Sequence, residues 1–135
     1  MNVEYCSKSK KTMGLDEPLK SSDIISIHCL LSNETKNLLN KRRLALLKQG
    51  AVLINTARPE ICDVEEVISL AKRGRIQAYF DELQDDGQRK RALAAGVFAT
   101  PDYGWMTEEA QKNDEEITLE NISAFLNGEP LRTVN

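Results

Sequence analysis

Residues 46–58 read LLKQGAVLINTAR, and this stretch decides the fold class. A helical pattern that presents Leu44 and Leu47 ends before Gly50, and a short apolar run at 51–54 follows at once. Short, nearly continuous apolar runs separated by helices are typical of a parallel sheet that helices cover. The pattern therefore predicts an α/β fold.

Five apolar runs along the chain are candidate strands, and capping residues mark the helices between them. The strands are predicted at residues 3–6, 23–29, 51–55, 76–81 and 97–100. Helices are predicted at residues 40–48, 63–74 and 107–128, each between an Asn, Asp or Thr cap and a terminal glycine. Residues 111–116 of the last helix have no apolar side, so they should lie in solvent or meet a partner.

Length and composition predict one folded domain. The 135 residues are 41% hydrophobic and 29% charged, which is ordinary for a globular protein. A net charge of -3 leaves no broad cationic surface, so no nucleic-acid partner is expected. No apolar run approaches a membrane span and residues 1–11 carry no signal-peptide core, so we expect a cytoplasmic protein with no membrane contact.

The cysteines and the single histidine offer little chemistry. Cys6, Cys29 and Cys62 are widely spaced and form no Cys-x-x-Cys pair, so we expect buried or half-buried free thiols and no metal site. His28 falls inside a predicted strand, where a half-buried structural imidazole is expected.

Three segments match one known family in order and spacing. They are SDIISIHCLLSNET (22–35), LLKQGAVLINTAR (46–58) and TPDYGWMT (100–107). With AFLNGEP (124–130), they make the chain resemble the D-isomer-specific 2-hydroxyacid dehydrogenases over nearly its whole length. The resemblance implies a Rossmann-like parallel sheet flanked by helices, with NAD or NADP across the carboxyl ends of the strands.

Three polar residues each follow the carboxyl end of a predicted strand, so they could converge on one crevice. They are Arg58, Asp81 and Asp102. By resemblance, Arg58 would hold the substrate carboxylate, which suits a guanidinium with paired donors, and Asp81 would meet the nicotinamide end of the cofactor. Thr56 and Ala57, beside Arg58, would also contact the cofactor.

The site departs from the family pattern at three places. Pro59-Glu60 replaces the usual Gly-Gly, which should weaken the anion clamp. Asp86 stands where the family has the glutamate that orients the catalytic histidine, although an acidic solvated turn ending at Gly87 is an equal reading. Asp102 stands in place of that histidine, and an ordinary aspartate, which is ionised at neutral pH, would need a pKa raised by several units to act as the acid.

The pyrophosphate loop of the family is missing from these 135 residues. The seven glycines include no Gly-x-Gly, so the first βα unit with its glycine loop is absent and weak or no cofactor binding is expected. The chain resembles the family from its second strand onward, which leaves a sheet of about five strands without its central one. Ser7 and Lys8 would then lie in the turn that meets the adenosine ribose and would fit a 2′-phosphate.

These observations predict that residues 1–135 form a single partial NAD(P)-binding domain that is inactive alone. One alternative is a non-catalytic binding or assembly module, which Asp102 and the polar 111–116 segment favour. Another is an oxidoreductase that works only with a complementing dehydrogenase chain. Because the missing strand would leave unpaired backbone groups, a homo-oligomer or such a complementing chain is the expected partner.

Overall fold

The computed structural model describes residues 2–3, 6 and 14–133. The chain divides into two compact units, Met1–Asp102 and Tyr103–Asn135. The candidate ribose contacts, Ser7 and Lys8, lie outside the described residues. Residues 4 and 5 of the strand predicted at 3–6 also lie outside them.

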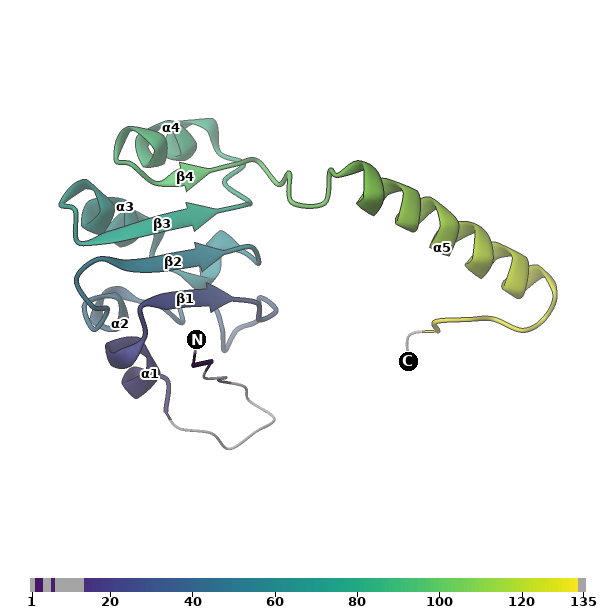
Figure 1. Cartoon of the computed structure of the whole chain (residues 1–135), viewed down its shortest axis with the longest axis horizontal. Coiled ribbons are helices and arrows are strands. Elements are labelled where there is room, and N and C mark those ends of the chain that lie inside the picture. The colour runs from purple at the N-terminus through teal and green to yellow at the C-terminus, as the bar shows by residue number, and fades with distance from the viewer. Residues whose placement is uncertain (1, 4–5, 7–13, 134–135) are drawn as a thin grey trace. The chain divides into compact units, whose positions relative to one another are not determined.

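The first unit is built on a four-stranded parallel sheet in the order β1-β2-β3-β4, with all four arrows pointing the same way in Figure 1. The strands are β1 (Ile24–Ile27), β2 (Ala51–Asn55), β3 (Ile76–Phe80) and β4 (Phe98–Ala99). This confirms the α/β fold with a Rossmann-like parallel sheet. β1, β3 and β4 are shorter than predicted, because the end residues of the predicted strands lie in the adjoining loops.

Helices connect the strands of the first unit. They are α1 (Asp16–Ser21), α2 (Lys41–Leu44), η1 (Pro59–Ile61), α3 (Val64–Lys72) and α4 (Asp86–Ala94). The predicted caps are confirmed: the Asn40 side chain accepts from the Arg43 N–H, and the Asp63 side chain accepts from the Glu66 N–H, both at 3.1 Å. The helix predicted at 40–48 is regular only in its first turn, and α1 and α4 were not predicted.

Ion pairs connect the short helix α1 to α2. Asp16 accepts hydrogen bonds from Arg42 Nη1 at 2.7 Å and Arg43 Nε at 3.2 Å. The Arg42 hydrogen bond, with Arg43 beside it, lowers the pKa of Asp16 below its usual value. Leu19 of α1 is buried in the core. A helix of six residues is not stable by helix propensity alone, so packing of Leu19 and the ion pairs of Asp16 stabilise α1.

The core lies on one face of the sheet. Side chains alternate along β2 and β3, and Leu53 and Phe80 are buried against the helices, with Leu44 and Val67 among the residues of the same cluster. Because the strands follow one another in sequential order, right-handed crossovers place the connecting helices on a single side.

The opposite face of the sheet is largely open in the first unit. Its two rows of side chains are Ile24–Val52–Gln77 and Ser26–Ile54–Tyr79–Phe98. Ile24 is 56% exposed and Phe98 62% exposed, while Tyr79 and Phe98 stack at 5.3 Å between ring centroids. Parallel sheets are ordinarily covered on both faces, so this apolar surface is unusual for an isolated unit.

The second unit is dominated by α5 (Glu108–Leu126), whose start at the Thr107 cap is confirmed by a 3.1 Å bond from the Ala110 N–H. The helix has no buried residue, and Gly128 follows it with φ of 79°. Of the helices in the described part of the chain, none is both long and apolar enough to cross a membrane.

Candidate functional site

The candidate site lies at the carboxyl ends of β2, β3 and β4, which meet at one edge of the sheet because the strands are parallel (Figure 1). Residues 56–63 follow β2, residues 81–85 follow β3, and residues 100–102 follow β4. The sequence placed Arg58, Asp81 and Asp102 on these loops, and the structure brings all three to this edge.

Asn55, the last residue of β2, organises the loop that carries Arg58. The side chain is 2% exposed; its Oδ1 accepts from the Ala57 N–H at 3.0 Å, and its Nδ2 donates to the Arg58 carbonyl at 2.9 Å. The Asn55 carbonyl also accepts from the Asp81 N–H at 3.0 Å. A single buried amide therefore fixes the Arg58 backbone, and its main chain joins that loop to the end of β3.

Arg58 is paired with a carboxylate of its own chain. Its Nη1 lies 2.5 Å from Oε2 of Glu82, and the same nitrogen donates to the Ala57 carbonyl at 3.0 Å. The Arg58 side chain is 53% exposed, whereas that of Glu82 is only 16% exposed. Glu82 thus holds Nη1 of the guanidinium that the resemblance assigns to a substrate carboxylate.

Asp81 is buried at the end of β3 and is held by two hydroxyl groups. Its Oδ1 accepts from Thr100 Oγ1 at 2.7 Å and from Tyr79 Oη at 3.2 Å, and Thr100 Oγ1 also reaches the Asp81 carbonyl at 3.1 Å. These bonds offset part of the cost of burying a carboxylate and fix its orientation.

Asp102 is half-buried and adopts a left-handed backbone conformation. Its φ is 73°, and its N–H donates to the Asp81 carbonyl. Just before it, Pro101 forms an antiparallel bridge with Glu82. The loop after β4 is therefore tied to the loop after β3, and Asp102 holds a conformation that Asn, Asp and His tolerate better than most residues.

Asp86 is the first residue of α4 and does not join this cluster. Its side chain is 74% exposed and forms an ion pair with Arg89 on its own helix, and Asp85 caps the helix by accepting from the Gln88 N–H at 2.6 Å. The alternative of a solvated turn ending at Gly87 was wrong, since Gly87 lies inside α4. The helix escaped prediction because DGQRKRALA has almost no apolar face; Ala92 alone is buried.

Thr56 and Ala57 are the other two residues predicted to contact the cofactor. Thr56 is exposed, and Ala57 is half-buried with its N–H bound to Asn55. Both lie in the loop that follows β2, and their contact with the cofactor stays a prediction.

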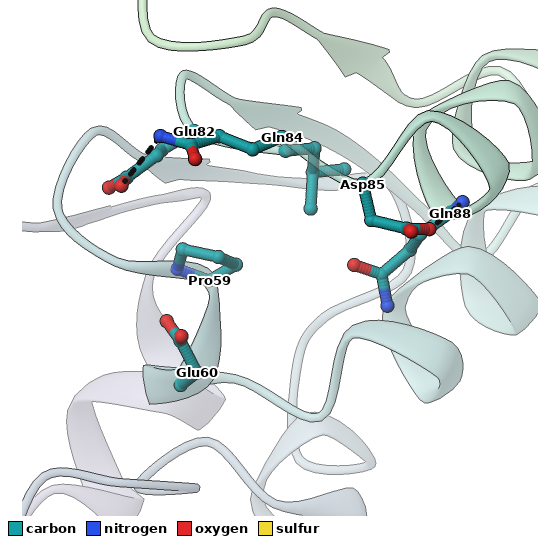
Figure 2. A pocket seen from close by; sticks show the side chains of 7 residues that line it. Pro59, Glu60, Glu82, Gln84, Asp85 and Gln88 are labelled. Carbon is teal, nitrogen blue, oxygen red and sulfur yellow. Dashed lines mark hydrogen bonds between the residues drawn. The ribbon is translucent and has the colours of Figure 1, made fainter.

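A pocket of about 210 Å³ opens beside the ion pair, between the loop after β2 and the loop after β3 (Figure 2). Its lining consists of Pro59, Glu60, Glu82, Leu83, Gln84, Asp85 and Gln88. Three of these residues carry carboxylates, and Gln84 donates to Oε1 of Glu82 at 3.4 Å across its rim. The pocket is acidic, so it opposes an anionic ligand.

The described residues fit only one end of a nicotinamide dinucleotide. Asp81, Thr100 and Asn55 offer polar groups at the strand ends, where the fold would place the nicotinamide. A pyrophosphate needs backbone N–H groups on a glycine-rich turn at a helix start, and the sequence has no Gly-x-Gly. The phosphates therefore have no matching donor set here.

Among the described residues there is also no cluster of His, Cys, Asp and Glu that could hold a metal ion.

Two predictions about isolated side chains need correction. His28 is exposed beyond the end of β1, with Nε2 2.7 Å from Ser26 Oγ, so it is not half-buried. Cys29 is half-buried and Cys62 buried as expected, but Cys6 is exposed; all three are free thiols. Burial raises the pKa of the Cys62 thiol to about 12, although a contact from Asn55 opposes the shift, so this thiol is not a nucleophile at neutral pH.

Sequence reasoning missed the partners of the candidate residues. Asn55 stands in the quoted LINTAR motif, and an Asn at the end of a buried strand before a turn was a usable signal for a loop-organising amide. Glu82 gave no such signal, because nothing local indicates that it meets a residue 24 positions earlier.

The fold and site together define a Rossmann-like α/β domain whose polar residues gather at the carboxyl ends of parallel strands. The family model described as "D-isomer specific 2-hydroxyacid dehydrogenase, NAD binding domain" matches residues 2–101. The chain belongs to this family, as its sequence motifs indicated.

Curated relatives agree. The chain is 30% identical over 125 residues to a hydroxypyruvate reductase of Blautia hydrogenotrophica, which covers 90% of this chain and 39% of the reductase. It is 32% identical over 149 residues to a glyoxylate reductase of Thermococcus litoralis, covering 100% of this chain and 45% of that protein. The chain thus spans less than half the length of these relatives.

Solved structures give the same picture. D-lactate dehydrogenase with NAD+ from Lactobacillus jensenii aligns with a TM-score of 0.79 at 30% identity, covering 99% of this chain and 46% of that one. An acyclic imino acid reductase in complex with NADPH and D-Arg also aligns with a TM-score of 0.79 at 30% identity, covering 98% and 43%. The family is NAD(P)-binding, and these two neighbours carry the two forms of the cofactor.

Proposed function

We propose that these 135 residues act as a partial NAD(P)-binding domain that binds nicotinamide nucleotides weakly and does not reduce 2-keto acids alone. The charge arrangement at the strand ends carries the proposal. Arg58 is neutralised by Glu82, three carboxylates line the adjacent pocket, and Asp102 occupies the position of the family's acid/base. An anionic substrate and an anionic cofactor would both meet repulsion there.

The missing chemistry extends beyond one residue. Hydride transfer requires the donor carbon and the carbonyl carbon to be held in a fixed geometry, which contributes more than the proton shuttle does. These 135 residues contain no Gly-x-Gly turn for a pyrophosphate and no recognisable substrate-binding segment. The site retains the position of the nicotinamide end without the groups that would hold the rest of the cofactor.

Nucleotide titration tests the proposal. Isothermal titration and ligand-observed NMR with NADH and NADPH should give dissociation constants no tighter than about millimolar, equivalent to roughly 4 kcal/mol of binding. The Lactobacillus jensenii D-lactate dehydrogenase, solved with NAD+, serves as the positive control. A micromolar constant for either nucleotide would refute weak binding.

A second candidate is an assembly role in which a second copy of this chain covers exposed surface. The outer edge of β1 has no strand beside it among the described residues, and the sheet face next to it carries the exposed Ile24 and Phe98. Charge supports self-association: residues 1–102 hold 16 Lys and Arg against 14 Asp and Glu, whereas residues 103–135 hold 2 against 7. Opposite net charges on the two units favour contacts between copies.

A complementing dehydrogenase chain is the competing partner. It would supply a parallel strand beside β1 and a glycine loop. This chain spans less than half the length of its relatives, which is compatible with such a partner. Affinity purification of the tagged chain from its own cells distinguishes the two partners. Recovery of a larger dehydrogenase subunit in stoichiometric amount would favour complementation, whereas recovery of this chain alone would favour self-association.

A further inference from the structure

We propose that Glu82 is an internal carboxylate ligand of Arg58 and that it disfavours the binding of carboxylate substrates at this site. The inference rests on the proposed function only in taking Arg58 as the substrate clamp. It predicts that the clamp is intact and masked rather than lost, so removing one charge should restore carboxylate binding.

The geometry of the pair supports this assignment. Glu82 Oε2 lies 2.5 Å from Arg58 Nη1, within the range of a charge-assisted hydrogen bond. A guanidinium binds a carboxylate through adjacent donors in one plane, so Glu82 at Nη1 takes one donor of the Nη1–Nη2 pair and also neutralises the positive charge that would attract a second carboxylate. Glu82 therefore competes directly with any substrate carboxylate for Arg58.

Glu82 is held in this position from both ends. Its backbone forms a bridge with Pro101, and its other carboxylate oxygen accepts from Gln84 Nε2 at 3.4 Å. Its side chain is 16% exposed, so solvent screens it less than an ordinary surface acid. A tethered and partly desolvated carboxylate has a high effective concentration, which a free 2-keto acid at millimolar concentration cannot match.

Arg58 in turn cannot move away from Glu82 easily. The amide of Asn55 fixes its carbonyl group, and Arg58 Nη1 also bonds the Ala57 carbonyl. Glu60 adds a second negative charge at the pocket nearby. The clamp is thus positioned for a carboxylate but already holds one.

The test compares carboxylate binding to the wild-type chain and to Glu82→Gln, which keeps the side-chain shape. Oxamate is the probe, oxamide is its uncharged control, and binding is read from the NMR shifts of the Arg58 Nε–H and of amides 56–58. Glu120→Gln is the matched control, because it frees Arg132 from a 2.8 Å ion pair in the second unit. It changes net charge equally and exposes another arginine.

We expect oxamate affinity at Arg58 to rise at least about tenfold in Glu82→Gln, to stay unchanged in Glu120→Gln, and to vanish in Glu82→Gln/Arg58→Ala. Glu82→Ser serves as a second variant if the glutamine chain folds poorly. Equal oxamate affinity at Arg58 in the wild type and in a folded Glu82 variant would overturn the inference. Because the readout needs no nucleotide, tight NADH binding would refute the proposed function without touching this result.

Discussion

The side chain of Asn55 donates to the carbonyl oxygen of Arg58 at 2.9 Å while its other end accepts from the Ala57 N–H at 3.0 Å. The two bonds close a tight turn directly after β2. They show that a buried amide holds the backbone of the Arg58 loop, with a further bond from Arg58 Nη1 to the Ala57 carbonyl.

Asn55→Ala should destabilise the first unit by about 2 kcal/mol, because a partly buried backbone N–H and carbonyl lose their partner. Urea unfolding followed by circular dichroism measures the change. Asn33→Ala, at an exposed loop position, is the control and should stay within roughly 0.5 kcal/mol of the wild type. Equal stability of the two variants would show that water replaces Asn55 as the hydrogen-bond partner of the Ala57 N–H and the Arg58 carbonyl.

The stability of the chain should fall steeply at alkaline pH because of Cys62. Burial raises the pKa of this thiol from 9.0 to about 12, so above pH 9 the unfolded state loses a proton that the folded state keeps. The associated stability is complete below pH 9 and is lost as the pH rises toward 12, by about 2 kcal/mol at roughly pH 10.5. Unfolding of the wild type and of Cys62→Ala in a reducing agent measures it, and the alanine variant should show the shallower pH dependence. Parallel pH profiles would contradict this assignment.

The thiols should also differ in their reactivity toward iodoacetamide. Cys6 is exposed and Cys62 is buried, with a raised pKa that disfavours the reactive thiolate. Mass spectrometry of the native chain at neutral pH should find Cys6 modified first and Cys62 only after addition of denaturant. Rapid modification of Cys62 under native conditions would indicate frequent local opening at the start of α3.

Asp102→His should not produce 2-keto acid reduction. The backbone permits the change, because His is among the residues that tolerate the positive φ of 73°. Restoring a general acid recovers a factor of about 10² to 10⁴ only where substrate and cofactor are already positioned, and we propose that these 135 residues do not position them. Consumption of NADH or NADPH with glyoxylate, pyruvate or hydroxypyruvate is the assay. Turnover clearly above that of Asp102→His/Arg58→Ala would mean that a working cofactor pocket exists without the glycine loop.

Self-association should depend on the open face of the sheet. Light scattering of the wild type is expected to show a dimer or larger species, and Ile24→Lys should shift it toward the monomer by placing a charge on that face. Leu93→Lys on α4 is the matched control, since Leu93 is 49% exposed and Ile24 is 56% exposed. A wild-type chain that remains monomeric at high concentration would exclude the assembly proposal.

The sequence by itself determined the elements whose signals are local. The apolar run at 51–54 gave β2, and Asn40, Asp63 and Thr107 gave the starts of three helices, because a cap and an apolar period need only neighbouring residues. The motifs also indicated the family, and the predicted strand ends placed Arg58, Asp81 and Asp102 at one edge of the sheet. α4 was missed because its sequence has almost no amphipathic pattern and its start depends on the Asp85 cap.

Only the tertiary structure decided what the candidate residues contact. Glu82 meets Arg58 across 24 positions, and Thr100 meets Asp81 across 19, because adjacent parallel strands bring their carboxyl ends together whatever the length of the connecting helix. The openness of one sheet face likewise follows from sequential strand order and crossover handedness, which no single segment encodes. Local patterns fix which residues reach the site, and the packing of distant segments fixes whether Arg58 is free for a ligand or paired with Glu82.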